Sequence, residues 1–162
     1  MIFITIGTQA PFDRLIRALD ECALAYKDHD FIAQVIPSDY EIKNMKVLGF
    51  IPPKEFDRYI SEADLIISHA GMGTILSSLT KGKPLLIFPR LAKYHEHRND
   101  HQLATATKFQ YLNYVYTAFD TEELKAKLAE LIDHPVTPLH HIGRYAPANF
   151  IEAIKKEIES GQ

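Results

Sequence analysis

The stretch IISHAGMGTIL, residues 66–76, contains the local pattern that decides the fold. An apolar β-rich run ends at Ser68, a turn with two glycines follows, and an apolar helical pattern begins at Thr74. A strand that leads through a short turn into a helix is the repeating unit of parallel α/β sheets. The stretch therefore predicts a strand–turn–helix junction at the carboxyl edge of such a sheet, where ligands of this architecture bind.

The rest of the chain alternates in the same way between apolar runs and amphipathic segments. The expected strands are residues 2–6, 31–36, 46–50, 64–68, 84–88 and 114–116. The expected helices are residues 11–26, 54–62, 74–81, 100–108, 121–132, with a start capped at Thr121, and 148–159. With no repeat and no linker, the pattern predicts a single Rossmann-like α/β domain over residues 1–162, a parallel sheet flanked by helices.

The composition excludes several classes of protein. Lys and Arg number 18 against 21 Asp and Glu, a net charge of −3, so nothing indicates a basic nucleic-acid footprint. A single cysteine, Cys22, rules out an internal disulfide framework, and together with the lack of a secretory signal it favours the cytoplasm. No apolar run reaches the roughly 18 residues that cross a bilayer, so we expect any membrane attachment to come through a partner or a surface patch.

The glycine turn of residues 71–74, which includes Met72, is a candidate phosphate site. The amides of a helix's first turn lack intrahelical partners and lie at the positive end of its dipole. Gly71 and Gly73 let the backbone approach an anion closely, while Thr74 and His69 offer further donors. The alternative, that these glycines merely form a tight turn, stays open because the pattern is short.

A second glycine turn, Gly7-Thr8-Gln9, follows the first expected strand. It opens at the same edge of the sheet, so the two turns together can grip a diphosphate from both sides. A loop with one glycine is nevertheless common at this position in any α/β fold.

The polar segment HEHRNDHQ, residues 95–102, is a third candidate. Its histidines suggest a metal, but neither their spacing nor any cysteine fits a zinc site, and we expect no metal and no cofactor. Paired donors and acceptors at Asn99, His101 and Gln102 fit the hydroxyl groups of a sugar better.

Several of these segments occur together in a known family. They are FITIGT (3–8), PFDRL (11–15), SHAGMGT (68–74), GKPL (82–85) and NDHQ (99–102). Nearly the whole chain resembles the C-terminal, donor-binding domain of family 28 glycosyltransferases. The likeness is greatest to free-standing catalytic subunits of two-part UDP-sugar transferases, which act in lipid-linked oligosaccharide or bacterial exopolysaccharide synthesis.

The resemblance implies half of a GT-B architecture and an inverting, UDP-sugar-dependent hexosyltransferase with a lipid-linked acceptor. It also implies a membrane-anchored partner subunit that binds the acceptor and supplies the general base. The chain is then expected at the cytoplasmic face of the membrane, held there by that partner. A non-catalytic nucleotide-sugar-binding or scaffolding subunit is the alternative.

The same resemblance implies roles for individual residues. Gly7 and Thr8 face the diphosphate, His69, Gly71, Gly73 and Thr74 hold the phosphates and the nucleoside side, and His101 and Gln102 contact the hydroxyls of the donor sugar. One position departs from the family, because Ser77 stands where many relatives place an acidic residue that binds the ribose hydroxyls. A serine offers only one hydroxyl there, which leaves the donor less certain than the phosphate site.

Two other enzymes of related architecture fit less well. A UDP-N-acetylglucosamine 2-epimerase needs a chain about twice this length. A Rossmann dehydrogenase needs a three-glycine fingerprint after the first strand and an acidic residue at the end of the second. The apolar stripe of Phe150, Ile151, Ile154 and Ile158 in the last expected helix either packs on its own domain or contacts a partner.

Overall fold

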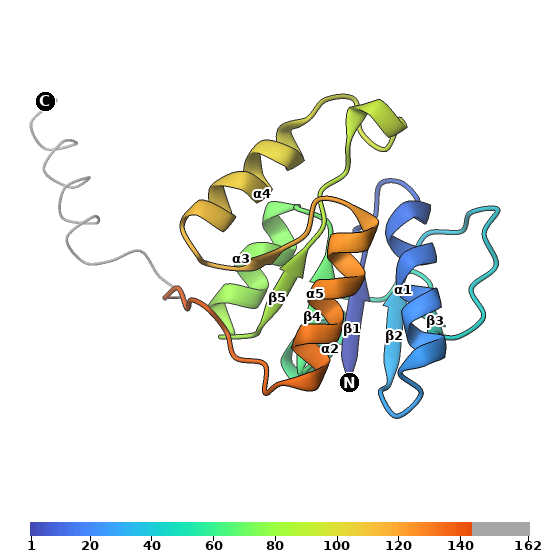
Figure 1. Cartoon of the computed structure of the whole chain (residues 1–162), viewed down its shortest axis with the longest axis horizontal. Helices are drawn as coiled ribbons and strands as arrows, with labels where there is room; N and C mark the ends of the chain where they lie inside the picture. The colour runs from blue at the N-terminus through green and yellow to red at the C-terminus, as the bar shows by residue number, and fades with distance from the viewer. Residues whose placement is uncertain (144–162) are drawn as a thin grey trace, which may run out of the picture.

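The computed structural model describes residues 1–143 and contains a six-stranded parallel sheet in the order β3-β2-β1-β4-β5-β6 (Figure 1). The strands are β1 Ile2–Thr5, β2 Phe31–Gln34, β3 Lys46–Leu48, β4 Leu65–Ser68, β5 Leu85–Ile87 and β6 Tyr116–Thr117. Every neighbouring pair is parallel. The predicted α/β class and parallel sheet are confirmed.

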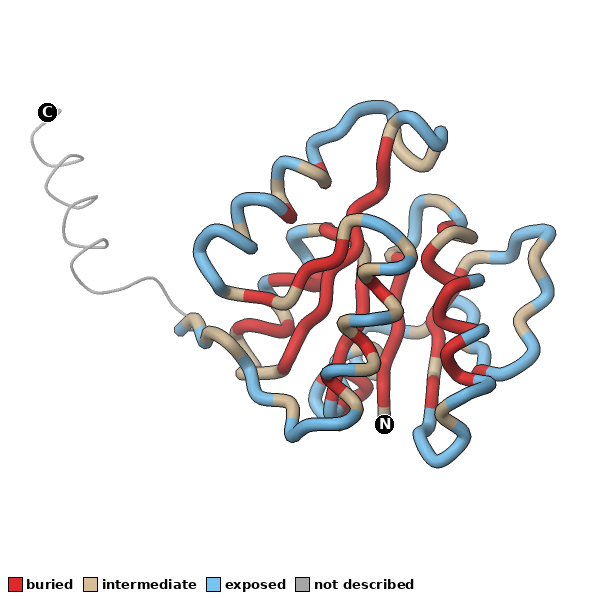
Figure 2. Tube along the Cα trace, in the orientation of Figure 1, coloured by how far each residue is buried: buried red, intermediate tan, exposed pale blue. Residues whose placement is uncertain are grey.

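Helices cover both faces of the sheet. They are α1 Asp13–Ala25, α2 Pro53–Glu62, α3 Met72–Thr80, α4 His101–Tyr111 and α5 Thr121–Asp133, with a 3₁₀ turn, η1, at Ala92–Tyr94. One core cluster packs α1 and α5 on one face, and a second packs α2, α3 and α4 on the other. Burial is accordingly continuous along the central strands, whose residues are enclosed by both layers (Figure 2).

Three local features differ from the sequence-based expectation. Helix α3 begins at Met72, two residues early, because Gly71 takes the extended N-cap conformation. The cap of α5 is Asp120 rather than Thr121, since its carboxylate accepts a hydrogen bond from the Glu123 amide at 2.8 Å. The turn η1 interrupts a segment expected to be loop. The last expected helix, residues 148–159, lies outside the described residues.

Across residues 1–143, none of the helices is both long enough and apolar enough to cross a membrane.

Candidate functional site

The strand order places the site at the centre of the sheet. The chain runs from β1 outward to β3 in one direction and from β4 outward to β6 in the other, so the order reverses between β1 and β4. In open α/β sheets the crevice at this reversal, outside the carboxyl ends of the strands, is where ligands bind. The two glycine turns, after β1 and after β4, border this crevice.

The first turn of α3 presents unused hydrogen-bond donors. Within residues 1–143, the amides of Met72, Gly73 and Thr74 donate no hydrogen bond, and the first bonded amide is that of Ile75, to the Gly71 carbonyl at 3.2 Å. No side chain caps this end of the helix. Three free amides at the positive end of a helix dipole form a seat for an anion.

His69 is wedged between the two glycine turns. A Cβ atom built on Gly71 would lie 2.8 Å from both ring nitrogens of His69, and one built on Gly7 would lie 2.8 Å from Nε2. Gly7 also has a φ of +77°, which favours glycine. Both glycines are therefore needed for this packing, whereas a Cβ on Gly73 would meet nothing within 4 Å. The free space at Gly73 leaves its backbone open to a ligand.

The environment of His69 keeps its ring neutral. Burial, aided by the nearby charge of Arg90, lowers the pKa of His69 from 6.5 to about 4, although neighbouring Gln102 opposes the shift. Its Nδ1 is buried without a hydrogen-bond partner among the described residues. At neutral pH the ring thus carries one N–H donor and no charge.

This shift predicts how stability depends on pH. Above pH 6.5 His69 is neutral in both states, but between pH 6.5 and about 4 only the unfolded chain takes up the proton. The free energy of unfolding should therefore fall with falling pH across this window, by about 2 kcal/mol after allowance for partial exposure of the ring. We expect His69→Gln to remove this part of the fall. Urea unfolding of the wild type and of His69→Gln at pH 7.5, 5.5 and 4 measures this difference. If the free energy of unfolding fell equally with pH in both proteins, the prediction would be wrong.

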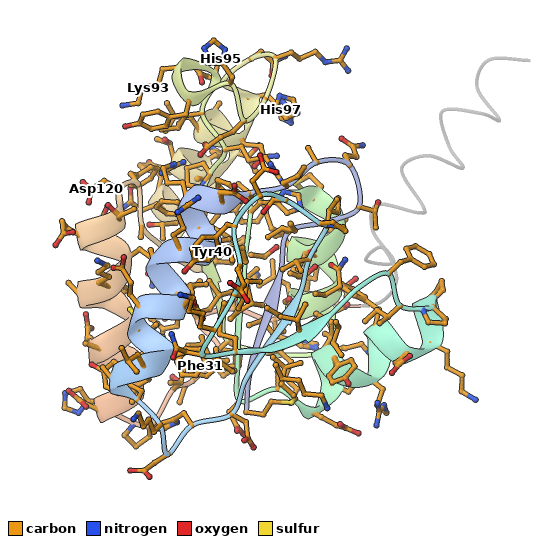
Figure 3. The ribbon with its side chains drawn as sticks, turned by 90° about the vertical axis from the view of Figure 1, so that its right-hand side faces the viewer. Phe31, Tyr40, Lys93, His95, His97 and Asp120 are labelled. Carbon is orange, nitrogen blue, oxygen red and sulfur yellow. The ribbon has the colours of Figure 1, made fainter. Side chains whose placement is uncertain are left out.

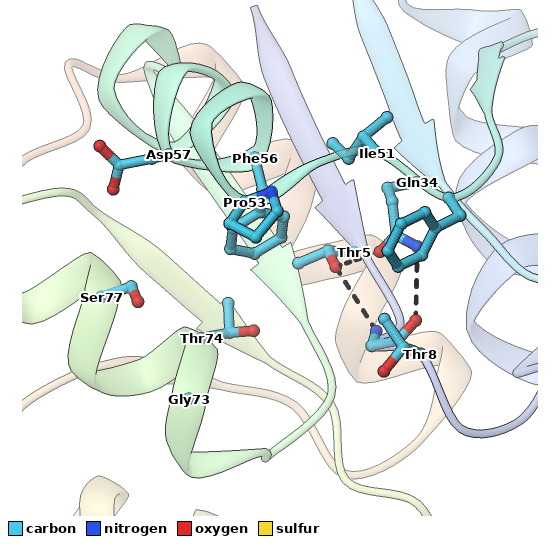
Figure 4. Close-up of a pocket in the computed structure, with 12 residues that line it drawn as sticks. Thr5, Thr8, Gln34, Ile51, Pro53, Phe56, Asp57, Gly73, Thr74 and Ser77 are labelled. Carbon is cyan, nitrogen blue, oxygen red and sulfur yellow. Dashed lines mark hydrogen bonds between the residues drawn. The ribbon is translucent and has the colours of Figure 1, made fainter.

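Buried polar side chains at the strand ends support the first glycine turn. The Thr5 hydroxyl donates to Oε1 of Gln34 at 2.7 Å and accepts from the Gly7 amide at 3.4 Å (Figure 4). Gln34 in turn donates to the Gly7 carbonyl at 3.4 Å, and Ser68 donates to the Thr5 carbonyl at 2.9 Å. Thr5, Gln34 and Ser68 are register partners on three adjacent strands, which fixes the turn to the sheet.

A cavity of about 660 Å³, here called the histidine cavity, lies between the two glycine turns and the β5–α4 loop. It is lined by all of the predicted site residues except Met72 and Ser77: Gly7, Thr8, His69, Gly71, Gly73, Thr74, Asn99, His101 and Gln102. Gln9, His97 and Arg98 complete the described lining, which contains no carboxylate. Basic and amide groups without an acidic neighbour suit an anionic, hydroxyl-rich ligand.

A second cavity of about 490 Å³, here called the phenylalanine cavity, shares Gly7, Thr8, Gly73 and Thr74 with the first. Its walls are apolar on the α2 side, where Pro53 and Phe56 face Thr74 and Ser77 of α3 (Figure 4). Phe50 and Ile51 also line this cavity. Phe50 is 80% exposed, so its ring is accessible to a ligand. The free amides of α3 thus lie between an apolar cavity and a polar one.

Met72 and Ser77 are the two predicted residues that do not line the histidine cavity. The side chain of Met72 is 46% exposed and lines neither cavity, whereas Ser77 lines the phenylalanine cavity. That cavity also contains Asp57 of α2, whose carboxylate is paired with Lys81 at 3.0 Å. Sequence reasoning missed Asp57 and the apolar wall, because only the packing of α2 against α3 brings them to the site.

Three histidines lie close together in the sequence, His95 and His97 in the β5–α4 loop and His101 at the start of α4. Nδ1 of His101 lies 2.6 Å from Oδ1 of Asn99, and the rings of His97 and His101 pack edge to face at 4.5 Å. His97 lies with Lys93 and His95 at the end of the molecule opposite Phe31, the first residue of β2 (Figure 3). In the part of the chain that the structure describes, no group of three or more His, Cys, Asp or Glu side chains is placed to hold a metal ion.

Comparison with known proteins gives consistent matches. Residues 1–157 match the model of the glycosyltransferase family 28 C-terminal domain. A curated relative, the UDP-N-acetylglucosamine transferase subunit ALG13 of Saccharomyces cerevisiae, is 38% identical over 162 aligned residues, covering 75% of this chain and 78% of the relative. The match to the Candida albicans protein of the same name spans only 24% of that protein's length.

Solved structures share the fold. The NMR solution structure of ALG13 superposes with a TM-score of 0.59 at 25% identity, covering 94% of this chain and 93% of that one. A putative UDP-N-acetylglucosamine 2-epimerase from Listeria monocytogenes gives a TM-score of 0.68 at 12% identity, but the match spans 45% of its chain. The domain therefore shares its fold with nearly the whole of this ALG13 structure and with somewhat less than half of the epimerase chain.

Proposed function

Because this chain belongs to the glycosyltransferase family 28 C-terminal domain family, we propose that it binds a UDP-sugar as the donor-binding catalytic subunit of a two-component hexosyltransferase. The observation that carries the proposal is the set of free amides at Met72, Gly73 and Thr74 in the first turn of α3, where Gly73 and Thr74 line both cavities. A diphosphate on these amides directs one substituent into each cavity.

The chemistry of each cavity suits one end of a nucleotide sugar. The apolar walls at Phe50, Ile51 and Phe56 suit a planar base, and the Ser77 hydroxyl and the Asp57 carboxylate are the polar groups beside them that can bind ribose hydroxyls. The histidine cavity offers Asn99, His101 and Gln102 to the hydroxyls of the sugar. UDP-N-acetylglucosamine is the first donor to test, since the curated relatives are named for it.

In the proposed reaction the acceptor hydroxyl attacks the anomeric carbon, the bond to the diphosphate breaks, and UDP leaves. A single direct displacement of this kind inverts the anomeric configuration. The α3 amides stabilise the negative charge that grows on the diphosphate, and the neutral His69 ring donates its N–H there.

A partner subunit supplies the general base and the lipid-linked acceptor in this proposal. The support is that no carboxylate lines the histidine cavity among residues 1–143. Such a partner, if anchored in the membrane, holds the chain at the cytoplasmic face. Exopolysaccharide synthesis, which the sequence resemblance also implied, gains no support from the relatives that match, so the acceptor is proposed only as a lipid-linked sugar.

The test compares binding with transfer. By calorimetry we expect the purified chain to bind UDP and one of UDP-N-acetylglucosamine, UDP-glucose and UDP-glucuronate, because the whole donor site is its own. We expect it to transfer sugar to a lipid-linked acceptor only when the co-expressed partner is present. Absence of UDP binding would refute the donor site, and efficient transfer by the chain alone would place the base within it, with His97 and His101 as the first candidates.

The non-catalytic alternative is separated by variants assayed in the complex. Gly73→Ala adds a methyl group that would meet no other part of the protein within 4 Å, so the fold and its assembly with the partner should persist. Loss of transfer by the intact complex would exclude a scaffolding role, whereas full transfer would support one.

A further inference from the structure

A buried arginine joins the two loops that form opposite walls of the histidine cavity. Arg90, 4% exposed, follows β5, yet its guanidinium donates to three backbone carbonyls of the β1–α1 loop. These are the carbonyls of Ile6 at 3.0 Å, Ala10 at 2.7 Å and Pro11 at 2.6 Å. The guanidinium also lies 4.5 Å from the centre of the Phe12 ring.

An ion pair makes a second connection between the same loops. Arg14, in the first turn of α1, forms a two-point contact with Glu96 at 2.7 and 2.8 Å and donates to the Pro89 carbonyl at 2.8 Å. The pair is well enclosed, with side chains 16% and 11% exposed. Glu96 also accepts from the Leu91 amide at 2.9 Å, which ties the far part of its loop back to the start.

Burying these polar and charged side chains costs free energy that apolar side chains would not cost. An arginine buried among carbonyls loses much of its hydration, and apolar side chains of similar size often stabilise a core equally well. What such groups provide is a fixed geometry, because the planar guanidinium places its acceptors in set directions.

That geometry acts on the cavity walls. The β1–α1 loop carries Gly7, Thr8 and Gln9 on one side, and the β5–α4 loop carries residues 97–99 on the other. The backbone amide of Arg90 also donates to Oε1 of Gln102 at 3.2 Å, which leaves the Gln102 amino group as the free end of that side chain.

Building on the proposed function, we propose that Arg90 and the Arg14–Glu96 pair are positioning residues for the donor sugar. They hold residues 97–102 at a set distance from Gly7–Gln9 and so determine which sugar the site accepts. In the proposed function the diphosphate rests mainly on the α3 amides and the base lies against the wall formed by Phe50, Ile51 and Phe56, and none of these groups is hydrogen-bonded to Arg90, Arg14 or Glu96.

The test measures calorimetric affinities for UDP and for the preferred UDP-sugar in Arg90→Lys, Arg14→Met and Glu96→Gln. We expect UDP affinity to stay within about threefold of the wild type, while UDP-sugar affinity falls at least about tenfold. With the partner present, the ratio of kcat/KM between UDP-N-acetylglucosamine and UDP-glucose should shrink in the same variants.

Arg17→Met is the matched control, since Arg17 lies one turn further along α1, is exposed and stacks on Tyr40. Should Arg90→Lys fail to fold, the affinities of Arg14→Met and Glu96→Gln test the proposal instead. If the affinities for UDP and for the UDP-sugar fell equally, or if neither fell, this inference would be overturned, while the proposed donor site would not be affected. A wild-type protein that binds neither ligand would overturn the proposed function itself.

Discussion

Gly71→Ala is expected to weaken UDP binding by at least about 30-fold, or about 2 kcal/mol. The new methyl group would overlap the His69 ring, whose two nitrogens lie 2.8 Å from its position. The ring can escape only toward the histidine cavity, because Gly7 and Gly71 hold it from two sides. The displaced ring then occupies the space above the α3 amides, and calorimetry with UDP measures the loss.

Gly73→Ala tests whether a ligand approaches this part of the backbone, because the substitution should change UDP affinity without disturbing the packing of the protein. Its Cβ would meet no protein atom within 4 Å, so stability should stay constant or rise by about 0.5–1 kcal/mol because alanine favours the helix. We still expect about a tenfold loss of UDP affinity, since the methyl group stands where a phosphate approaches the backbone. Unchanged affinity would show that the anion does not sit on this turn.

A double variant tests the cause of the Gly71 effect. In His69→Ala/Gly71→Ala the ring that the methyl group would overlap is gone, so the melting temperature should recover relative to Gly71→Ala alone. If the two substitutions instead lower it additively, the overlap with His69 is not the reason.

Asp20→Ala is expected to lower the free energy of unfolding by about 3 kcal/mol. The Asp20 carboxylate is 2% exposed and accepts hydrogen bonds from the Tyr40 hydroxyl at 2.8 Å, the Lys43 amide at 3.1 Å and the Asn44 amide at 2.7 Å. These three donors hold the β2–β3 connection onto α1, and the substitution removes their common acceptor. Urea unfolding of the wild type and the variant measures the difference in the free energy of unfolding.

Two controls accompany this variant. Tyr40→Phe removes a single hydrogen bond and should cost about 1 kcal/mol. Glu21→Ala, the adjacent position on α1, removes an exposed pair with Lys125 and should cost less than about 0.5 kcal/mol. UDP affinity should be unchanged throughout, because the β2–β3 connection lines neither cavity. A weakened affinity in Asp20→Ala would show that this loop reaches the site.

Much of the candidate site is predictable from the sequence because its parts follow strands directly. Gly7, His69 and the β5–α4 loop come just after β1, β4 and β5, and parallel strands bring their carboxyl ends to one edge. The glycines and the polar run at residues 95–102 mark these positions by residue type alone. Such local sequence patterns can be recognised even when the order of the strands in the sheet is not known.

The apolar wall and the loop connections were not predictable in this way. Phe50 and Asp57 reach the site through the packing of α2 on α3, and an exposed phenylalanine or aspartate has no distinctive sequence pattern. Arg90 contacts carbonyls some 80 positions earlier in the chain, which depends on β4 lying between β1 and β5. The start of α3 was placed late because Gly71 and Gly73 are poor helix formers, although Gly71 serves as the N-cap.

The meeting of two cavities at Gly7, Thr8, Gly73 and Thr74 has a consequence for the order of events after transfer. Under the proposed function, once the anomeric bond is broken the sugar departs with the acceptor from the histidine cavity while the spent nucleotide still fills the phenylalanine cavity. UDP should therefore be the last product to leave and should act as an inhibitor that competes with the donor. In that case we expect the escape of UDP from the first turn of α3 to limit turnover.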